Sequence, residues 1–221
     1  MTFWISCLRL LDKKAKVIVF LLLLAQCIFF YHYFFVSPMT HIYEWGEILF
    51  GLKVVTPWIL PMTLYLNFKM LPLDQTFIQI RSLVKERSKK TFIIVVMNSL
   101  LSIIIPLFCA ILDVSHYFSL KETILIIFCV IGRWMFFLWN VSLVQCIGMS
   151  QFKNKSIWTI FVFVFLFVLC NISKQASYLC VLFLTPVYNY QLTLPLLLLT
   201  IGYAIFLPIL YIHLEEKREL L

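Results

Sequence analysis

Six apolar stretches, of which only the fifth is short for a helix that crosses a lipid bilayer, dominate the sequence. A transmembrane helix needs roughly 20 mostly apolar residues, because each residue advances it by about 1.5 Å. The predicted spans are Val17–Val36, Ile48–Phe68, Phe92–Leu112, Thr123–Ile147, Ile157–Ile172 and Leu192–Leu214. The sequence therefore predicts one all-α integral membrane domain, residues 1–221, with six transmembrane helices.

The composition agrees with lipid as the main solvent. Of the 221 residues, 63% are hydrophobic and 13% are charged, and the mean hydropathy is +1.00. Soluble domains carry about 25% charged and about 45–50% apolar residues. A soluble core of this size cannot hide so many apolar side chains, so the composition favours a membrane protein.

The Lys and Arg residues are distributed unevenly between the two sides of the predicted bundle. Fourteen of the 18 fall in the two terminal tails and in the loops after the second and fourth spans, whereas only Lys121 and Lys174 fall on the opposite side. Cytoplasmic loops carry an excess of Lys and Arg. The pattern therefore predicts a multi-pass membrane protein with both termini in the cytoplasm. The same bias explains the net charge of +8 without nucleic acid as a partner.

The loop after the second span contains a predicted amphipathic helix. After Pro72, Asp74 stands where an N-cap carboxylate would satisfy free backbone N–H groups. The apolar stripe of this helix consists of Leu73, Phe77, Ile80 and Val84. Arg81 and Lys85 lie off the stripe. Two interpretations stay open: the helix rests on anionic lipid headgroups, or it docks onto a cytoplasmic protein.

The N-terminal tail shows a similar pattern. Its apolar face is formed by Phe3, Trp4, Leu8 and Leu11, with Arg9, Asp12 and Lys13 opposite. Tryptophan is stable at the boundary between lipid and water. The tail is therefore predicted to form an interfacial helix that leads into the first span.

Arg133 lies ten residues inside the fourth predicted span. A charge at the bilayer centre costs roughly 2.5–3.5 kcal/mol on insertion scales. Two interpretations remain. The side chain extends to the outer boundary between lipid and water, or it has a role at a contact between subunits or in a translocation path. The middle of the predicted spans carries no Asp or Glu, the residues that proton- and sodium-driven carriers use as relays. Any transport is therefore expected to draw its energy from elsewhere.

Catalytic and metal-binding motifs are missing from the sequence. The four histidines are scattered, the seven cysteines form no CxxC pair, and no P-loop or GxSxG motif occurs. The sequence predicts neither an active site, nor a metal site, nor a cofactor bound by this chain.

The predicted architecture resembles the permease subunits of ABC-2-type transporters. The shared features are six spans, both termini inside, the two amphipathic helices and an apolar segment, Tyr178–Thr185, similar to the outer re-entrant segment of that family. The resemblance assigns ATPase coupling to Leu73, Asp74, Phe77, Ile80, Arg81, Val84 and Lys85. It also implies a separate cytoplasmic ATPase that binds ATP and Mg²⁺, and a second permease copy or paralogue.

The small size and the richness in Phe, Ile and Lys resemble permeases of Gram-positive bacteria. This resemblance implies a location in a bacterial cell membrane. Such permeases handle amphipathic peptides, in bacteriocin or lantibiotic immunity or in export of phenol-soluble modulins. The alternatives are a six-helix substrate-binding subunit of a vitamin importer, an immunity protein that binds a toxin without moving it, and an intramembrane enzyme. The first usually carries AxxxA motifs in its first span, and this chain has only Ala25 there.

Overall fold

The computed structural model describes residues 2–32, 55–78, 84–117, 119–172 and 194–219, and these ranges contain helices but no strand. The elements are α1 (Thr2–Leu10), α2 (Lys13–Tyr31), a π-helical turn η2 (Val55–Ile59), α5 (Leu60–Ile78), α6 (Val84–Tyr117), α7 (Leu120–Gln151), α8 (Lys155–Ile172) and α10 (Leu194–Glu219). The all-helical prediction is confirmed.

Two helices of the described ranges, Lys13–Tyr31 and Glu86–Leu112, are long and apolar enough to cross a membrane. The stretch Lys155–Val168 is apolar but shorter. Helices α7 and α10 overlap the fourth and sixth predicted spans. The number of spans and their orientation stay predictions, and the segments 33–54 and 173–193, with Lys53 and Tyr178–Thr185, lie outside the described residues.

Helix α5 differs from the expectation that Pro72 ends the second span. The helix continues through Pro72 as far as Ile78, so no new helix begins at Asp74. Proline is tolerated inside membrane helices when neighbouring groups satisfy the backbone carbonyl that it leaves free. The predicted N-cap role of Asp74 is therefore wrong, although the amphipathic pattern around it is unaffected.

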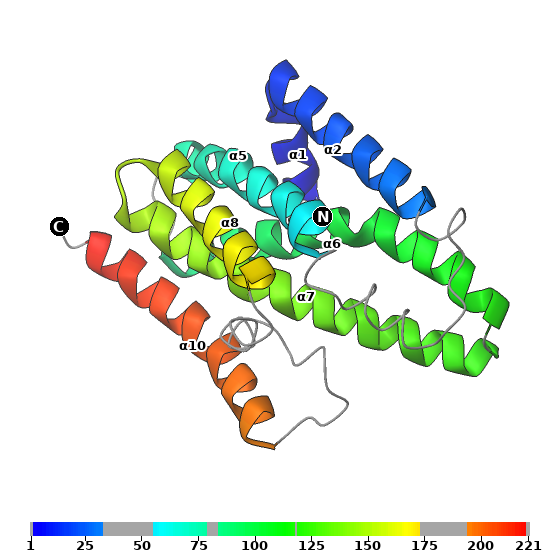
Figure 1. Ribbon diagram of the computed structural model, residues 1–221. Helices are drawn as coiled ribbons and strands as arrows, with labels where there is room; N and C mark the ends of the chain where they lie inside the picture. Colours follow the sequence, from blue (N-terminus) through cyan, green and yellow to red (C-terminus); the bar gives the residue numbers. More distant parts are fainter. Residues whose placement is uncertain (1, 33–54, 79–83, 118, 173–193, 220–221) are drawn as a thin grey trace.

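The bundle is built around the long helices α6 and α7, which lie side by side (Figure 1). Helix α5 packs against both of them, α8 packs against α5 and α7, and α10 crosses α7 and α6. Helices α1 and α2 pack on α5 and α6. At one end of the bundle, the start of α6 meets the end of α10 through an ion pair between Arg87 and Glu215, with N and O atoms 3.8 Å apart.

Two helix starts are fixed by side-chain caps. The carboxylate of Asp12 accepts a hydrogen bond from the backbone N–H of Ala15 at 2.8 Å, which begins α2 directly after α1. The amide oxygen of Asn154 accepts from the N–H of Ile157 at 3.4 Å and begins α8 after the short turn that follows α7. Such caps satisfy backbone donors that have no partner within the helix.

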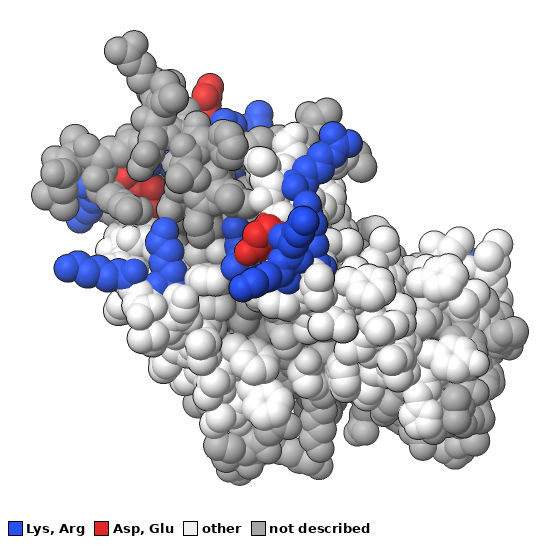
Figure 2. Space-filling model, turned by 90° about the horizontal axis from the view of Figure 1, so that it is seen from above, with Lys and Arg blue, Asp and Glu red and all other residues white. Residues whose placement is uncertain are grey.

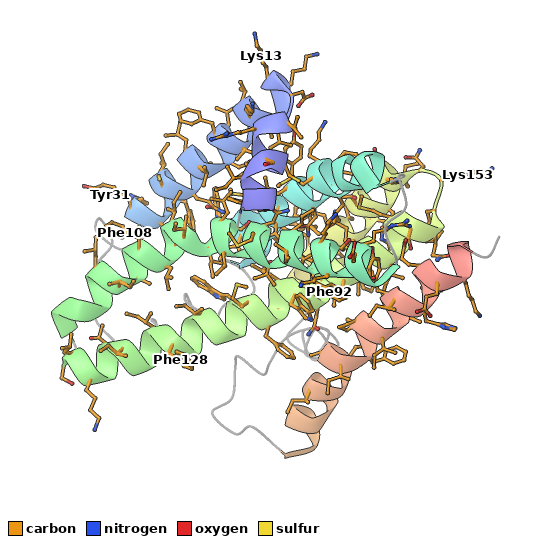
Figure 3. All side chains as sticks on the ribbon, turned by 180° about the vertical axis from the view of Figure 1, so that it is seen from behind. Lys13, Tyr31, Phe92, Phe108, Phe128 and Lys153 are labelled. Atoms are coloured by element: carbon orange, nitrogen blue, oxygen red, sulfur yellow. The ribbon has the colours of Figure 1, made fainter. Side chains whose placement is uncertain are left out.

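The exterior of the bundle is strongly apolar. Large exposed hydrophobic side chains on α2, α6, α7, α8 and α10 include Phe20, Phe108, Phe128, Ile160 and Ile209. Phe108 and Phe128 point away from α6 and α7 (Figure 3). On the face seen in Figure 2, described Lys and Arg side chains cluster over one part and leave a broad uncharged area. Monomeric soluble proteins rarely expose apolar patches this extensive.

Candidate functional site

The core of the bundle contains a chain of hydrogen-bonded amide side chains. The Asn98 side chain on α6 donates to the amide oxygen of Asn67 on α5 at 3.0 Å. Asn67 in turn donates to Ser142 Oγ at 2.9 Å and to Gln145 Oε1 at 3.2 Å, both on α7. All four side chains are fully buried, with 0% of their surface exposed. The network therefore fastens three helices without any charge.

The same network reaches two further helices. Gln145 donates to Thr159 Oγ1 on α8 at 3.2 Å and to the backbone oxygen of Leu64 on α5 at 2.9 Å. At the other end, the indole N–H of Trp4 on α1 donates to Asn98 Oδ1 at 2.9 Å. Trp4 is thus half-buried against the bundle. Its apolar companions Leu8 and Leu11 also face the bundle, as the amphipathic pattern predicts.

A second polar contact joins α2 to α6 at a proline. Pro106 has no backbone N–H, so the carbonyl of Ser102, four residues earlier, loses its helical donor. The side chain of Gln26 donates to this carbonyl at 3.3 Å and to the carbonyl of Trp58 at 2.6 Å. Pro106 therefore leaves α6 continuous and creates the acceptor that holds α2.

Asn140 on α7 is enclosed but makes no such contacts. Its side chain is 0% exposed, and neither Nδ2 nor Oδ1 has a hydrogen-bond partner within the described ranges. An enclosed amide without partners costs free energy of folding. Asn140 and Asn67 therefore form a natural pair for testing what the polar network contributes.

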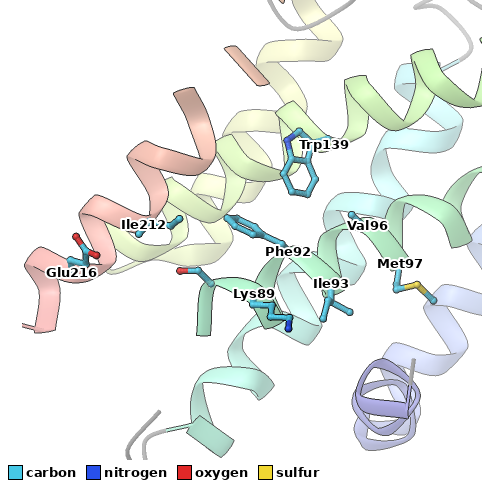
Figure 4. Close-up of a pocket in the computed structure, with 9 residues that line it drawn as sticks. Lys89, Phe92, Ile93, Val96, Met97, Trp139, Ile212 and Glu216 are labelled. Carbon is cyan, nitrogen blue, oxygen red and sulfur yellow. The ribbon is translucent and has the colours of Figure 1, made fainter. Parts of the chain in front are cut away.

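A groove of about 780 Å³ lies between α6, α7 and α10 (Figure 4). Its walls are apolar and consist of Phe92, Ile93, Val96, Met97, Trp139 and Ile212. Its polar lining residues are Ser88, Lys89 and Glu216. The groove volume falls within the roughly 300–1,000 Å³ of ligand sites in proteins.

The polar residues of the groove all lie at one end of it. Ser88 and Lys89 stand at the start of α6, and Glu216 stands near the end of α10. The neighbouring pair Arg87 and Glu215 joins those two helix ends. The groove is therefore amphipathic, with an apolar body and a charged mouth.

The residues predicted to couple to an ATPase fall at the junction of α5 and α6. Leu73, Asp74 and Phe77 belong to the last turns of α5, and Val84 and Lys85 begin α6. Ile80 and Arg81 lie outside the described residues, and nothing is described of the other side chains. The backbone of Arg133 lies within α7, and its side chain is likewise not described. Both assignments stay predictions.

Sequence reasoning overlooked the buried amides and the groove. The available signal was the presence of Asn67, Asn98 and Gln145 inside apolar stretches, where polar residues mark interhelical contacts or functional sites. Within the described residues, no group of three His, Cys, Asp or Glu is placed to hold a metal ion. The arrangement is suited to holding an amphipathic molecule.

The comparisons with known proteins return no relatives. No protein-family model matches the chain, and neither does any curated protein or solved structure.

The hydrogen bond of Trp4 leads to a test of how α1 is held. Replacing Trp4 by phenylalanine removes the donor to Asn98 Oδ1 and keeps an aromatic ring. One interhelical hydrogen bond in a membrane bundle contributes about 0.6 kcal/mol. Trypsin cleavage after the exposed Lys13 and Lys14 is therefore expected to accelerate about threefold. Ile5→Ala, at an exposed position of α1, is the control and is expected to leave the cleavage rate unchanged.

Proposed function

We propose that the chain is the membrane-spanning permease subunit of an ATP-driven transporter of the ABC-2 type. A separate cytoplasmic ATPase supplies the energy, and a second permease copy or paralogue completes the assembly. The substrates are amphipathic or hydrophobic molecules such as antimicrobial peptides, and the direction is export. The apolar exterior supports a place in the membrane, and the excess of Lys and Arg on one side supports cytoplasmic termini.

The proposal is carried by how the predicted coupling segment, Leu73–Lys85, is attached to the core. This segment includes the last turns of α5 and the start of α6 and holds the amphipathic pattern of Phe77, Ile80 and Val84. The two helices that flank it are joined by the hydrogen bond between Asn98 and Asn67, and Asn67 continues to α7. A displacement of the segment by a bound protein would therefore pass to the helices of the core.

The amphipathic groove supports the choice of substrate class. An apolar body with a charged mouth matches molecules that have one apolar part and one polar part. The same feature would suit a stand-alone immunity protein that binds a toxin without transport. The two functions differ in one respect, because only the permease needs an ATPase partner.

Affinity purification from the native membrane in mild detergent tests the proposal. Mass spectrometry is expected to find a soluble ATPase in stoichiometric amount with the wild-type chain. Replacing Phe77, Ile80 and Val84 together by aspartate is expected to reduce the recovered ATPase at least about a hundredfold, because burial of each apolar side chain contributes roughly 1.5 kcal/mol or more.

The matched control adds the same charge off the stripe. Gln75, Gln79 and Ser82 are replaced together by aspartate, which leaves the three apolar side chains in place. This variant is expected to retain the ATPase. Recovery of the folded wild-type chain without any ATPase would refute the permease proposal and favour the stand-alone binding protein.

A further inference from the structure

We propose that the groove between α6, α7 and α10 holds a single phospholipid whose headgroup carries an ammonium group, such as phosphatidylethanolamine. An acyl chain lies along the apolar walls, the phosphate meets Lys89 and Ser88, and the ammonium meets Glu216. The proposal rests on the place of the chain in a membrane and is independent of transport and of an ATPase.

The apolar walls are suited to a hydrocarbon chain. Along α6, Phe92, Val96 and Met97 follow the charged mouth in sequence order, and Trp139 of α7 faces the same space (Figure 4). Within this part of the lining the residues offer no charge to a ligand. A flexible apolar chain therefore fits the body of the groove better than a polar molecule does.

The mouth carries one positive and one negative side chain. Lys89 and Glu216 both line the groove, and among the described side chains no ion pair joins them. Two opposite charges that do not neutralise one another are complementary to a ligand with both a phosphate and an ammonium group. An anionic headgroup without the ammonium would leave Glu216 facing negative charge.

Ser88 supplies a third polar contact. Its side chain is 2% exposed and lines the groove, and its Oγ has no hydrogen-bond partner within the described ranges. An enclosed hydroxyl without a partner is unfavourable. A phosphate oxygen would accept a hydrogen bond from it, and hydrogen bonds to ionised acceptors are the stronger kind.

The location of the mouth agrees with a lipid of one leaflet. The start of α6 and the end of α10 meet there, held by Arg87 and Glu215. In the predicted topology both helix ends lie at the cytoplasmic surface, where the headgroups of the inner leaflet are found. The charged mouth would then stand at headgroup level and the apolar body would extend into the hydrocarbon layer.

Native mass spectrometry of the full chain tests the proposal. The protein is reconstituted in nanodiscs of equimolar phosphatidylethanolamine and phosphatidylglycerol, extracted in mild detergent and weighed with its retained lipid. One retained phospholipid is expected, with phosphatidylethanolamine preferred about fivefold, as one charge contact at a membrane surface is worth roughly 1 kcal/mol. A preference for phosphatidylglycerol would overturn the headgroup assignment.

Two variants separate the groove from the bulk surface. Val96→Trp fills the body of the groove and is expected to lower the retained lipid about tenfold or more, since a filled site leaves no room for a chain. Leu100→Trp, one turn further along α6 at an exposed position outside the groove, is expected to retain the wild-type amount. Equal retention in the two variants would show that the lipid lies elsewhere.

Glu216→Gln tests the headgroup contact without altering the core. Glu216 is exposed, so folding is expected to be unaffected, and this is checked by size-exclusion chromatography. The variant is expected to keep one lipid but to lose the preference for phosphatidylethanolamine. An unchanged preference would refute the role of Glu216, whatever the outcome of the ATPase experiment.

Discussion

Replacing Gly148 by alanine is expected to destabilise the protein by about 3 kcal/mol, at the upper end of what overpacking a core costs. A Cβ atom at Gly148 on α7 would overlap the indole of Trp158 on α8. The indole cannot withdraw freely. It stacks on Phe152 with ring centroids 4.8 Å apart, and its N–H donates to the backbone oxygen of Val144 at 3.3 Å.

Thermal unfolding of the purified chain in detergent measures this effect. Gly202→Ala on α10 is the matched control, because a Cβ there meets nothing within 4 Å. Alanine is a better helix former than glycine by up to roughly 1 kcal/mol, so the control is expected to be neutral or stabilising. Equal unfolding temperatures of the two variants would contradict the close contact between Gly148 of α7 and Trp158 of α8.

Leucine at Asn67 is expected to lower the stability by about 2 kcal/mol, because three interhelical hydrogen bonds of roughly 0.6 kcal/mol each are lost. Leucine has the same branched shape and the same number of side-chain heavy atoms as asparagine, so the change removes polar contacts and leaves no cavity. The lost partners are the side chains of Asn98, Ser142 and Gln145. These three groups would remain enclosed without that partner.

Asn140→Leu is the comparison that isolates the network. Asn140 is as completely enclosed as Asn67 but has no hydrogen-bond partner among the described residues. Removing an unpartnered amide is expected to raise the stability by about 1 kcal/mol. Chemical denaturation in mixed micelles measures both variants. Equal losses of stability would mean that enclosed amides at these positions act only through their shape.

The helices were predictable because each is encoded locally. The apolar runs placed both ends of α7 and α8 within about four residues, whereas α6 begins at Val84, well before the predicted start at Phe92. The prediction that Pro72 ends its helix was wrong, since α5 continues through this residue. The prediction used only the local effect of proline on the backbone. The end of a helix at a proline depends on what surrounds the freed carbonyl, which no local pattern contains.

The site was less predictable because it depends on contacts between distant segments. Asn67 and Gln145 are 78 residues apart, and each by itself is one polar residue in an apolar run. The stripe of Phe92, Val96 and Met97 on α6 could be recognised as apolar, but the space beside it exists only because of how α10 crosses α7. Similarly, the spacing of Gly148 and Trp158 in the sequence does not indicate that the absence of a Cβ at Gly148 leaves room for the indole of Trp158.

The pairing of Asn67 with Asn98 bears on the order in which the chain assembles during synthesis. A chain emerges from its N-terminus, so α5 and α6 are complete before α7. Two amides in neighbouring helices satisfy each other at once, so α5 and α6 can pack together before α7 is made without leaving both amides unpaired. When α7 is added, the side chain of Gln145 accepts a hydrogen bond from Asn67 and donates one to the backbone oxygen of Leu64, and both partners are already in place on α5. The pair of Asn67 and Asn98 thus joins α5 to α6 in the nascent chain, and in the finished protein Asn67 also joins these helices to α7.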